Sequence, residues 1–314
     1  MPFRRLLVIF SVLLSPLCAT AASFSFAPFT GIRNSRTEEA LFFSGTFGTD
    51  SSEKCSLLEW NEKYVFVYGL DSEIVLENGK NSFEFSSRLQ SSLPFNQGLM
   101  TDTDWNSSLE KKHQTEFDLD ENMSFTFKTQ FAWSRKLDKG FSIQPSLSAS
   151  YDYLKFKGVN GRGWYYLDTD NPHYYPDEYL HPAGINYRSY KAALMTGLSV
   201  RKDFESGLTL TAGAEVSPFT FVLARDRHLG SKDYFTTDDY IYSYFKNYSV
   251  YADVHYRFNN RLSIFAQLRG SYFFFTKGEE YYNWDNGSKN TVSSQKAGYS
   301  YKDFEIILGV RRTF

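Results

Sequence analysis

The feature that most constrains the fold is a two-residue alternation of apolar and polar side chains that recurs along the chain. It is clearest in three segments, 208–218, 248–258 and 262–272. Successive side chains of a strand point to opposite faces, so each segment has one apolar face and one polar face. A half-buried sheet of a soluble protein produces the same pattern, but here the polar faces carry Glu215, Asp253 and Arg269. Such charges are typical of a wet barrel lumen opposite a lipid-facing wall.

Composition favours the same class of protein. Aromatic residues make up 18% of the chain, with 30 Phe and 23 Tyr, although charged residues reach 22% and the mean hydropathy is −0.43. An excess of aromatic side chains fits the girdles with which a transmembrane barrel meets the two membrane interfaces. The formal net charge is only −2, so nothing in the charge balance indicates a nucleic-acid partner.

The beginning of the chain has the pattern of an export signal. Two arginines precede an apolar run over 6–17, and small residues at 19–21 provide a cleavage site. The run is shorter than the about 20 residues that a spanning helix needs. We therefore expect a signal peptide over 1–22 and a single domain over 23–314 that resides in the outer membrane.

Turn residues divide the chain into alternating short and long connections. Short turns are indicated near 78–79, 137–140, 205–207 and 259–260, and long polar stretches near 48–60, 95–115, 157–187, 224–245 and 276–298. They separate ten expected strands, at 37–50, 61–77, 81–101, 114–134, 141–157, 187–203, 207–224, 245–258, 261–277 and 297–314. Barrels of this kind place short turns in the periplasm. The prediction is an all-β fold, a ten-stranded antiparallel transmembrane β-barrel with short periplasmic turns and long extracellular loops.

Two short motifs carry the groups with catalytic potential. Asp102-x-Asp104 lies at the outer end of the expected third strand, and Asp226-x-His228 lies just past the outer end of the seventh. Residues i and i+2 of an extended chain share a face, so each motif presents both groups to one side. Taken singly, each motif is most simply a solvated turn. Together on one rim they can activate water, because a carboxylate fixes the imidazole tautomer and leaves the other nitrogen basic.

The chain resembles the omptins, a family of outer-membrane barrel proteases. The resemblance runs from about Phe24 to Phe314 and is carried by Leu99–Ser108, Ser56–Trp60, Glu116–Leu119, Gly184–Tyr187 and Asp226–His228. It implies an endopeptidase with its active site facing the cell exterior. Its implied partners are peptide or protein substrates and outer-membrane lipid. It also implies lipopolysaccharide as a candidate activator, with no metal and no other cofactor. The oligomeric state stays open.

The resemblance also implies a role for each residue of the two motifs. Water would lie between Asp102 and His228 and attack the scissile carbonyl carbon directly, without an acyl-enzyme. Asp226 would orient His228 and stabilise its protonated form, and Asp104 would hold the geometry and charge state of Asp102. Two close carboxylates disfavour ionising together, so this pair is expected to retain a proton near neutral pH.

Substrate preference is the least determined part of the resemblance. Omptins prefer to cleave between basic residues, and one acid of their first substrate pocket corresponds to Glu53. The second corresponds to Ala224, which carries no charge, so a weaker preference for arginine or lysine is expected. A simpler interpretation makes Glu53 a solvated loop residue, because Asp50 and two serines beside it form a polar turn. A function of another class also stays open, a non-catalytic barrel that acts as an adhesin or receptor.

Overall fold

The computed structural model describes residues 21–43, 53–94, 98–106, 108–166, 172–175, 183–228, 235–284 and 291–314. Among these residues no helix is long and apolar enough to cross a bilayer. The predicted signal peptide over 1–22 lies outside the described residues, apart from its last two positions, which begin the first strand.

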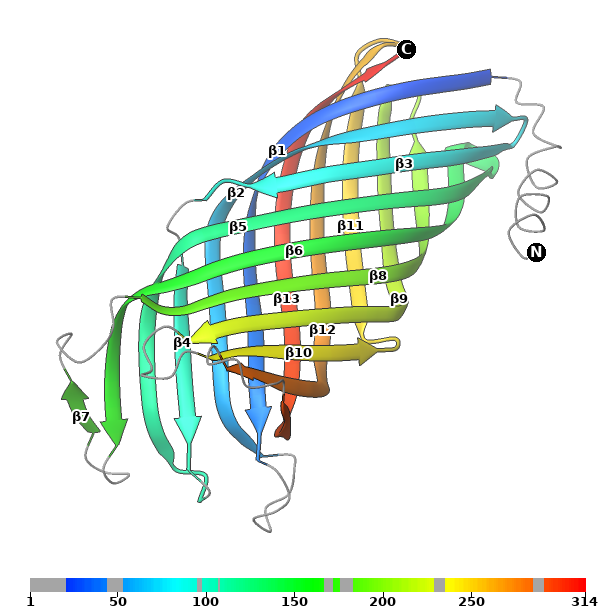
Figure 1. Ribbon diagram of the computed structural model, residues 1–314. Coiled ribbons are helices and arrows are strands. Elements are labelled where there is room, and N and C mark those ends of the chain that lie inside the picture. Colours follow the sequence, from blue (N-terminus) through cyan, green and yellow to red (C-terminus); the bar gives the residue numbers. More distant parts are fainter. Residues whose placement is uncertain are drawn as a thin grey trace.

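Thirteen strands form one sheet, and their pairings are antiparallel (Figure 1). The strands are β1 (Ala21–Phe42), β2 (Lys54–Asn78), β3 (Asn81–Ser92), β4 (Gly98–Trp105), β5 (Lys111–Lys136), β6 (Phe141–Tyr166), β7 (Pro172–Tyr175), β8 (Ala183–Asp203), β9 (Leu208–His228), β10 (Phe235–Ser243), β11 (Asn247–Arg257), β12 (Leu262–Trp284) and β13 (Thr291–Thr313). The fold prediction is confirmed in its class, an all-β antiparallel sheet.

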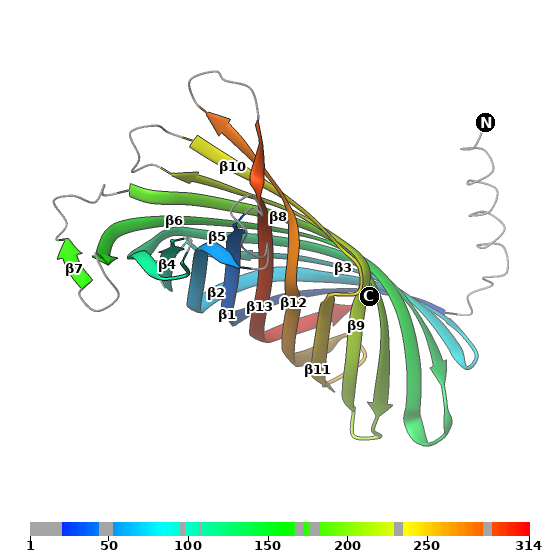
Figure 2. The same cartoon turned by 90° about the horizontal axis from the view of Figure 1, so that it is seen from below.

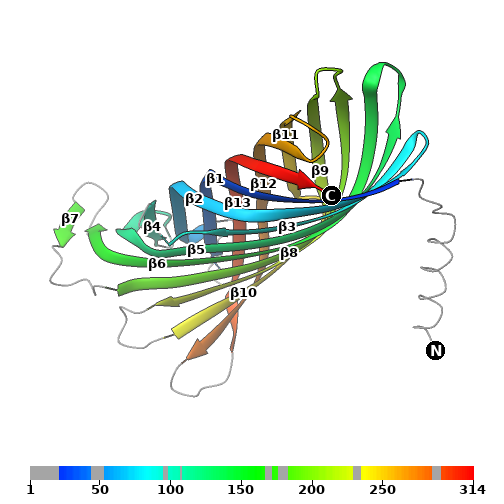
Figure 3. The same cartoon turned by 90° about the horizontal axis from the view of Figure 1, so that it is seen from above.

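The first strand joins the last. β1 pairs with β2 along one edge and with β13 along the other, so that Ile32 lies opposite both Phe66 and Ile306. β3 and β4 pair in succession with the same two neighbours, β2 and β5. β10 and β11 lie in the same way between β9 and β12. The sheet therefore closes on itself. Figures 2 and 3 show its strands from below and from above.

The outer surface of the closed sheet carries an apolar belt. Its members are more than a third exposed and include Phe26, Ile32, Leu70, Ile74, Phe127, Phe131, Leu198, Leu210, Val254, Ile264 and Leu308. Alternation sends their polar neighbours inward, where they neutralise one another. Lys128 Nζ lies 2.7 Å from Glu215 Oε2, and Arg88 Nε lies 2.8 Å from Asp71 Oδ1. The interior at the level of the belt is thus polar and rich in ion pairs.

The short turns lie where the sequence predicts them, between β2 and β3, β5 and β6, β8 and β9, and β11 and β12. Gly79 and Gly207, with φ of 60° and 85°, adopt the left-handed backbone that tight turns favour. The long loops are shorter than predicted, because β4, β10 and the ends of β6 and β9 occupy stretches expected to be loops. The first strand differs most, since β1 covers Ala21–Phe42 instead of 37–50. Serine, proline and glycine interrupt the apolar alternation there, which hides the strand from a pattern search.

Candidate active site

Asp102 and Asp104 lie within β4 and face the interior of the barrel. On β5, Asp102 lies opposite Thr115 and Asp104 lies opposite His113. Met100 on the same strand is fully buried and belongs to the interior cluster. Because alternate residues of a strand share a face, both carboxylates project into the barrel on the rim side of Met100. The structure therefore brings these two predicted residues together on a strand rather than in a loop.

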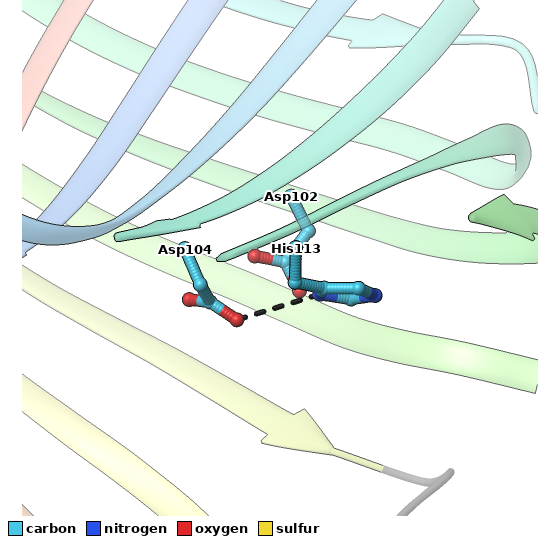
Figure 4. Close-up of side chains that lie close together, drawn as sticks. All are labelled: Asp102, Asp104 and His113. Atoms are coloured by element: carbon cyan, nitrogen blue, oxygen red, sulfur yellow. Dashed lines mark ion pairs between the residues drawn. The ribbon is translucent and has the colours of Figure 1, made fainter. Parts of the chain in front are cut away.

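His113 joins this carboxylate pair. Its Nδ1 lies 3.4 Å from Oδ2 of Asp104 (Figure 4), and its Nε2 lies 2.6 Å from Oγ1 of Thr115. One ligand atom from each of Asp102, Asp104 and His113 falls within 4.8 Å of the other two. The Asp104 side chain is 41% exposed and that of His113 is 16% exposed. The three groups therefore form one cluster, at a position that solvent reaches.

Asp226 lies on the opposite part of the wall. β9 continues to His228, so the second motif also lies in a strand, with Asp226 between Tyr187 of β8 and Thr237 of β10. The Asp226 side chain is buried. His228 is the last residue of β9, two positions further towards the rim, and its side chain lies outside the part of the chain that the structure describes.

Three stacked aromatic rings connect the two motifs across the lumen. The ring centroids of Trp60 on β2 and Tyr187 on β8 lie 5.0 Å apart, and Phe156 on β6 lies 5.4 Å from Trp60. All three side chains are fully buried. Tyr187 is the ladder partner of Asp226, and Trp60 lies two residues after the ladder partner of Asp102. The stack therefore joins β2, the ladder neighbour of β4, to β8, the ladder neighbour of β9, and forms an aromatic floor inside the barrel.

Several of the sequence segments that carry the family resemblance contribute side chains to this floor. The buried cluster includes Leu58, Trp60, Phe117, Leu119, Ile185 and Tyr187. Gly184 permits the packing of Phe117, because a Cβ at that position would lie 2.1 Å from Cε1 of the Phe117 ring. No side chain fits at that distance. The floor thus depends on a glycine in β8 and an aromatic ring from β5.

Three carboxyl groups missed by the sequence analysis are buried beside this floor. They are Glu39 on β1, Asp239 on β10 and Glu280 on β12, all beyond the apolar belt. Burial, together with the charges of Asp239 and Asp226, raises the pKa of Glu39 well above its ordinary value. Burial and the charge of Glu280 likewise raise the pKa of Asp239. In the described part of the chain, neither Glu39 nor Asp239 forms an ion pair with a basic residue.

The two positions expected to shape the first substrate pocket have different surroundings. Ala224 is fully buried in the floor cluster and lies directly opposite Asp239 in the β9–β10 ladder. Glu53 lies one residue before β2, is half-buried, and its carbonyl oxygen accepts a hydrogen bond from the Phe43 backbone at 3.1 Å. Glu53 is not one of the buried acids. The signal that could have found Glu39 and Asp239 is an acid at an inward position of a strand, which requires the strand bounds.

Comparisons with known proteins agree with this architecture. A model of the omptin family matches residues 20–314. The outer membrane protease OmpT from Escherichia coli is similar in structure, with a TM-score of 0.78, 16% sequence identity, and coverage of 93% of this chain and 97% of that chain. The translocator domain of the autotransporter NalP from Neisseria meningitidis gives a TM-score of 0.37 at 9% identity, covering 100% of this chain and 95% of that chain. No curated protein sequence gave a significant match.

Proposed function

The chain belongs to the omptin family, and on this premise we propose that it is an outer-membrane endopeptidase that hydrolyses peptide bonds near basic residues. The observation that carries the proposal is that both motifs lie on strands whose neighbours are joined by the aromatic stack. Asp102 and Asp104 face inward from β4, Asp226 faces inward from β9, and the Trp60–Tyr187 stack links their strands. A non-catalytic barrel has no need of inward-facing carboxylates on both sides of an aromatic floor.

In the proposed mechanism, a water molecule binds between Asp102 and His228. His228 takes its proton as general base while the oxygen attacks the scissile carbonyl carbon, and the same proton then passes to the leaving amine. Asp226 orients His228 and stabilises the imidazolium that forms. Asp104 sets the charge state of Asp102, because two close carboxylates do not ionise together readily. The 3.4 Å contact between His113 and Asp104 supports this carboxylate pair from β5.

The sheet is proposed to be a ten-position transmembrane barrel. β3 with β4, and β10 with β11, each occupy one position between the same neighbours, and β7 pairs with β6 alone among the described strands. A barrel strand spans a bilayer with about 9–11 residues, whereas β2 has 25 and β6 has 26. The part of each strand that carries the apolar belt spans the membrane. The remaining length carries the active site beyond the bilayer, to the cell exterior.

Lipopolysaccharide is the proposed activator, and a basic row on the outer wall supports it. Lys155 and Arg188 are direct cross-strand neighbours on β6 and β8, and Arg225 follows on β9, where its guanidinium is ion-paired with Asp238 of β10. The row lies just beyond the belt, next to the rings of Tyr153 and Tyr190, whose centroids are 5.2 Å apart. Basic side chains above interfacial aromatic residues fit the phosphate groups of an anionic lipid headgroup. A lipid bound there would contact β8 and β9, which carry Tyr187 and Asp226.

Mass spectrometry of a peptide mixture tests the proposed function. Protein refolded with lipopolysaccharide should generate new termini in a set of basic peptides, and heat-unfolded protein should generate none. The competing adhesin or receptor hypothesis predicts intact peptides, together with partner binding that survives substitution of Asp102 and His228. Intact peptides in every condition would remove the peptidase proposal.

A further inference from the structure

The imidazole of His113 has an oxygen atom on each side. Its Nδ1 lies 3.4 Å from Oδ2 of Asp104 on β4, and its Nε2 lies 2.6 Å from Oγ1 of Thr115, two residues further along β5. Thr115 is fully buried, whereas the Asp104 side chain is 41% exposed. The ring therefore connects a buried hydroxyl group to a carboxyl group that solvent reaches.

The strand ladder fixes this arrangement from two sides. Asp104 of β4 is the ladder partner of His113, and Asp102 is the ladder partner of the next inward residue of β5, which is Thr115. Alternate residues of a strand share a face, so the two pairs lie next to each other on the inner wall. One step further inward on β5, Phe117 belongs to the floor cluster. The imidazole is therefore positioned by a strand whose inner part packs in the floor.

Three titratable groups share this part of the inner wall. One atom from each of Asp102, Asp104 and His113 lies within 4.8 Å of the other two. Two carboxylates at such a distance repel each other, so a positive charge or a proton beside them stabilises the cluster. An imidazole is more basic than a carboxyl group, with an ordinary pKa of about 6.5 against about 3.9. A proton that the cluster takes up therefore binds the imidazole in preference to either carboxyl group.

The contacts of the ring agree with a charged imidazole. An imidazolium donates a hydrogen bond from each of its two nitrogens and accepts none. Both ring nitrogens of His113 face oxygen atoms that can accept, a carboxylate oxygen of Asp104 and the hydroxyl oxygen of Thr115. On the other side of β5, the ladder partner of His113 is Tyr165 of β6, whose side chain lies outside the part of the chain that the structure describes. The charged groups placed beside the ring are thus the two carboxyl groups of β4.

We propose that His113 and Thr115 are positioning residues of the proposed peptidase. His113 carries the proton that the close pair of carboxyl groups would otherwise retain, and Thr115 orients the ring by accepting a hydrogen bond from Nε2. Asp104 accepts a hydrogen bond from Nδ1, which leaves Asp102 ionised to accept one from the attacking water. The contact of 3.4 Å to Asp104 is long for a hydrogen bond, and it shortens when substrate binds, as hydrogen bonds of catalytic sites commonly do. The proposal rests on the proposed function and adds two residues of β5 to its two motifs.

Nitrogen NMR of protein with isotope-labelled histidine tests the proposal without any cleavage. The chain has 5 histidines, and the signals of His113 are those that disappear in His113→Ala. Near neutral pH, both ring nitrogens of His113 should carry a proton in the wild type. In Asp104→Asn the ring should be largely neutral at the same pH, because the carboxylate that faces Nδ1 is gone. A neutral His113 in the wild type, or an equally protonated ring in Asp104→Asn, overturns the proposal whether or not any peptide is cleaved.

Kinetics separate positioning from a purely structural role. His113→Ala should lower kcat on the order of tenfold or more, the equivalent of one hydrogen bond to a charged group, with KM near the wild-type value. Added imidazole should restore part of that rate, and Thr115→Val should lower kcat less, because the ring keeps its proton and loses only its orientation. The matched control is His255→Ala, since Nε2 of His255 on β11 also has a hydroxyl partner, Oγ of Ser263 at 2.8 Å, and it should leave both constants unchanged. A folded His113→Ala protein with the wild-type kcat overturns the proposal.

Discussion

At the scale of residues, the buried carboxyls make stability depend on pH. Glu39 and Asp239 have raised pKa values, caused first by burial and then by neighbouring carboxyl charges. The titratable groups that face them are Asp226 on β9, Glu280 on β12, Tyr187 on β8, Tyr299 on β13 and the neighbouring Asp238 on β10. A folded state that holds these protons more tightly than the unfolded chain is favoured at low pH.

The resulting prediction has a definite sign. The stabilisation is complete below the unfolded carboxyl pKa, at about 4, and it is lost as pH rises through the higher folded-state values. The apparent unfolding temperature of the wild type should therefore fall as pH increases from about 4. The unfolding temperature of Asp239→Asn should fall less steeply with pH. The substitution removes one ionising group, and it also removes the negative charge of Asp239 that raises the pKa of Glu39. Heat-induced unfolding followed by gel mobility measures both. Identical slopes for wild type and Asp239→Asn would contradict the assignment.

Residue-level prediction from sequence is possible where the relevant geometry is local. Asp102 and Asp104, and Asp226 and His228, stand two apart on an extended chain, so their shared faces follow from strand geometry alone. The three buried carboxyl groups could not be found in this way. Glu39, Asp239 and Glu280 are far apart in the sequence, and only the ladder register places Asp239 beside Glu280 and Ala224. Position 224 on β9 is neutral, and its ladder partner on β10 is Asp239.

At the scale of elements, the sequence identified the membrane-spanning segments better than whole strands. Alternation is strong where one face meets the apolar belt and the other meets the polar lumen. Beyond the belt the inner face becomes apolar as well, as with Val222 and Ala224 of β9 in the floor cluster, yet backbone hydrogen bonding continues to His228. The pattern therefore ends before the strand does. Both predicted catalytic motifs, expected at or just past the outer ends of two strands, lie on these extensions.

Substitution of Gly184 tests the contact between β8 and the Phe117 ring of β5. Replacing it with alanine would force a methyl group against the Phe117 ring, where the nearest carbon lies at 2.1 Å. Overpacking of this kind costs about 1–3 kcal/mol, so Gly184→Ala should lower the apparent unfolding temperature and the peptidase rate together. Phe117→Leu in the same chain should recover part of both losses by removing ring atoms. A Gly184→Ala protein with wild-type stability and rate would show that the floor is not tightly packed.

At the scale of the whole molecule, the proposed activation by lipopolysaccharide couples the outer wall to the interior. The basic row of Lys155, Arg188 and Arg225 lies on the same strands that position Tyr187 and Asp226 inside. Peptidase rates in detergent should therefore rise on adding lipopolysaccharide. Lys155→Ala with Arg188→Ala should shift the half-activating concentration upward on the order of tenfold, since charge-assisted contacts to phosphate are lost. Lys139→Ala, in the turn between β5 and β6, is the matched control and should behave as wild type. Equal rates with and without lipopolysaccharide would remove the dependence.

The most direct test of the central claim is kcat/KM for one basic peptide, measured for wild type and for four variants of the two motifs. The account predicts that His228→Ala, Asp226→Asn and Asp102→Asn each lower kcat/KM by about 10²–10⁴-fold, the range for removing a general acid–base group. Asp104→Asn should have a smaller effect, because Asp104 acts through Asp102. Asp138→Asn, in the exposed turn between β5 and β6, should retain the wild-type value. Folded variants of Asp102 and His228 that cleave at the wild-type rate would contradict water activation between these residues.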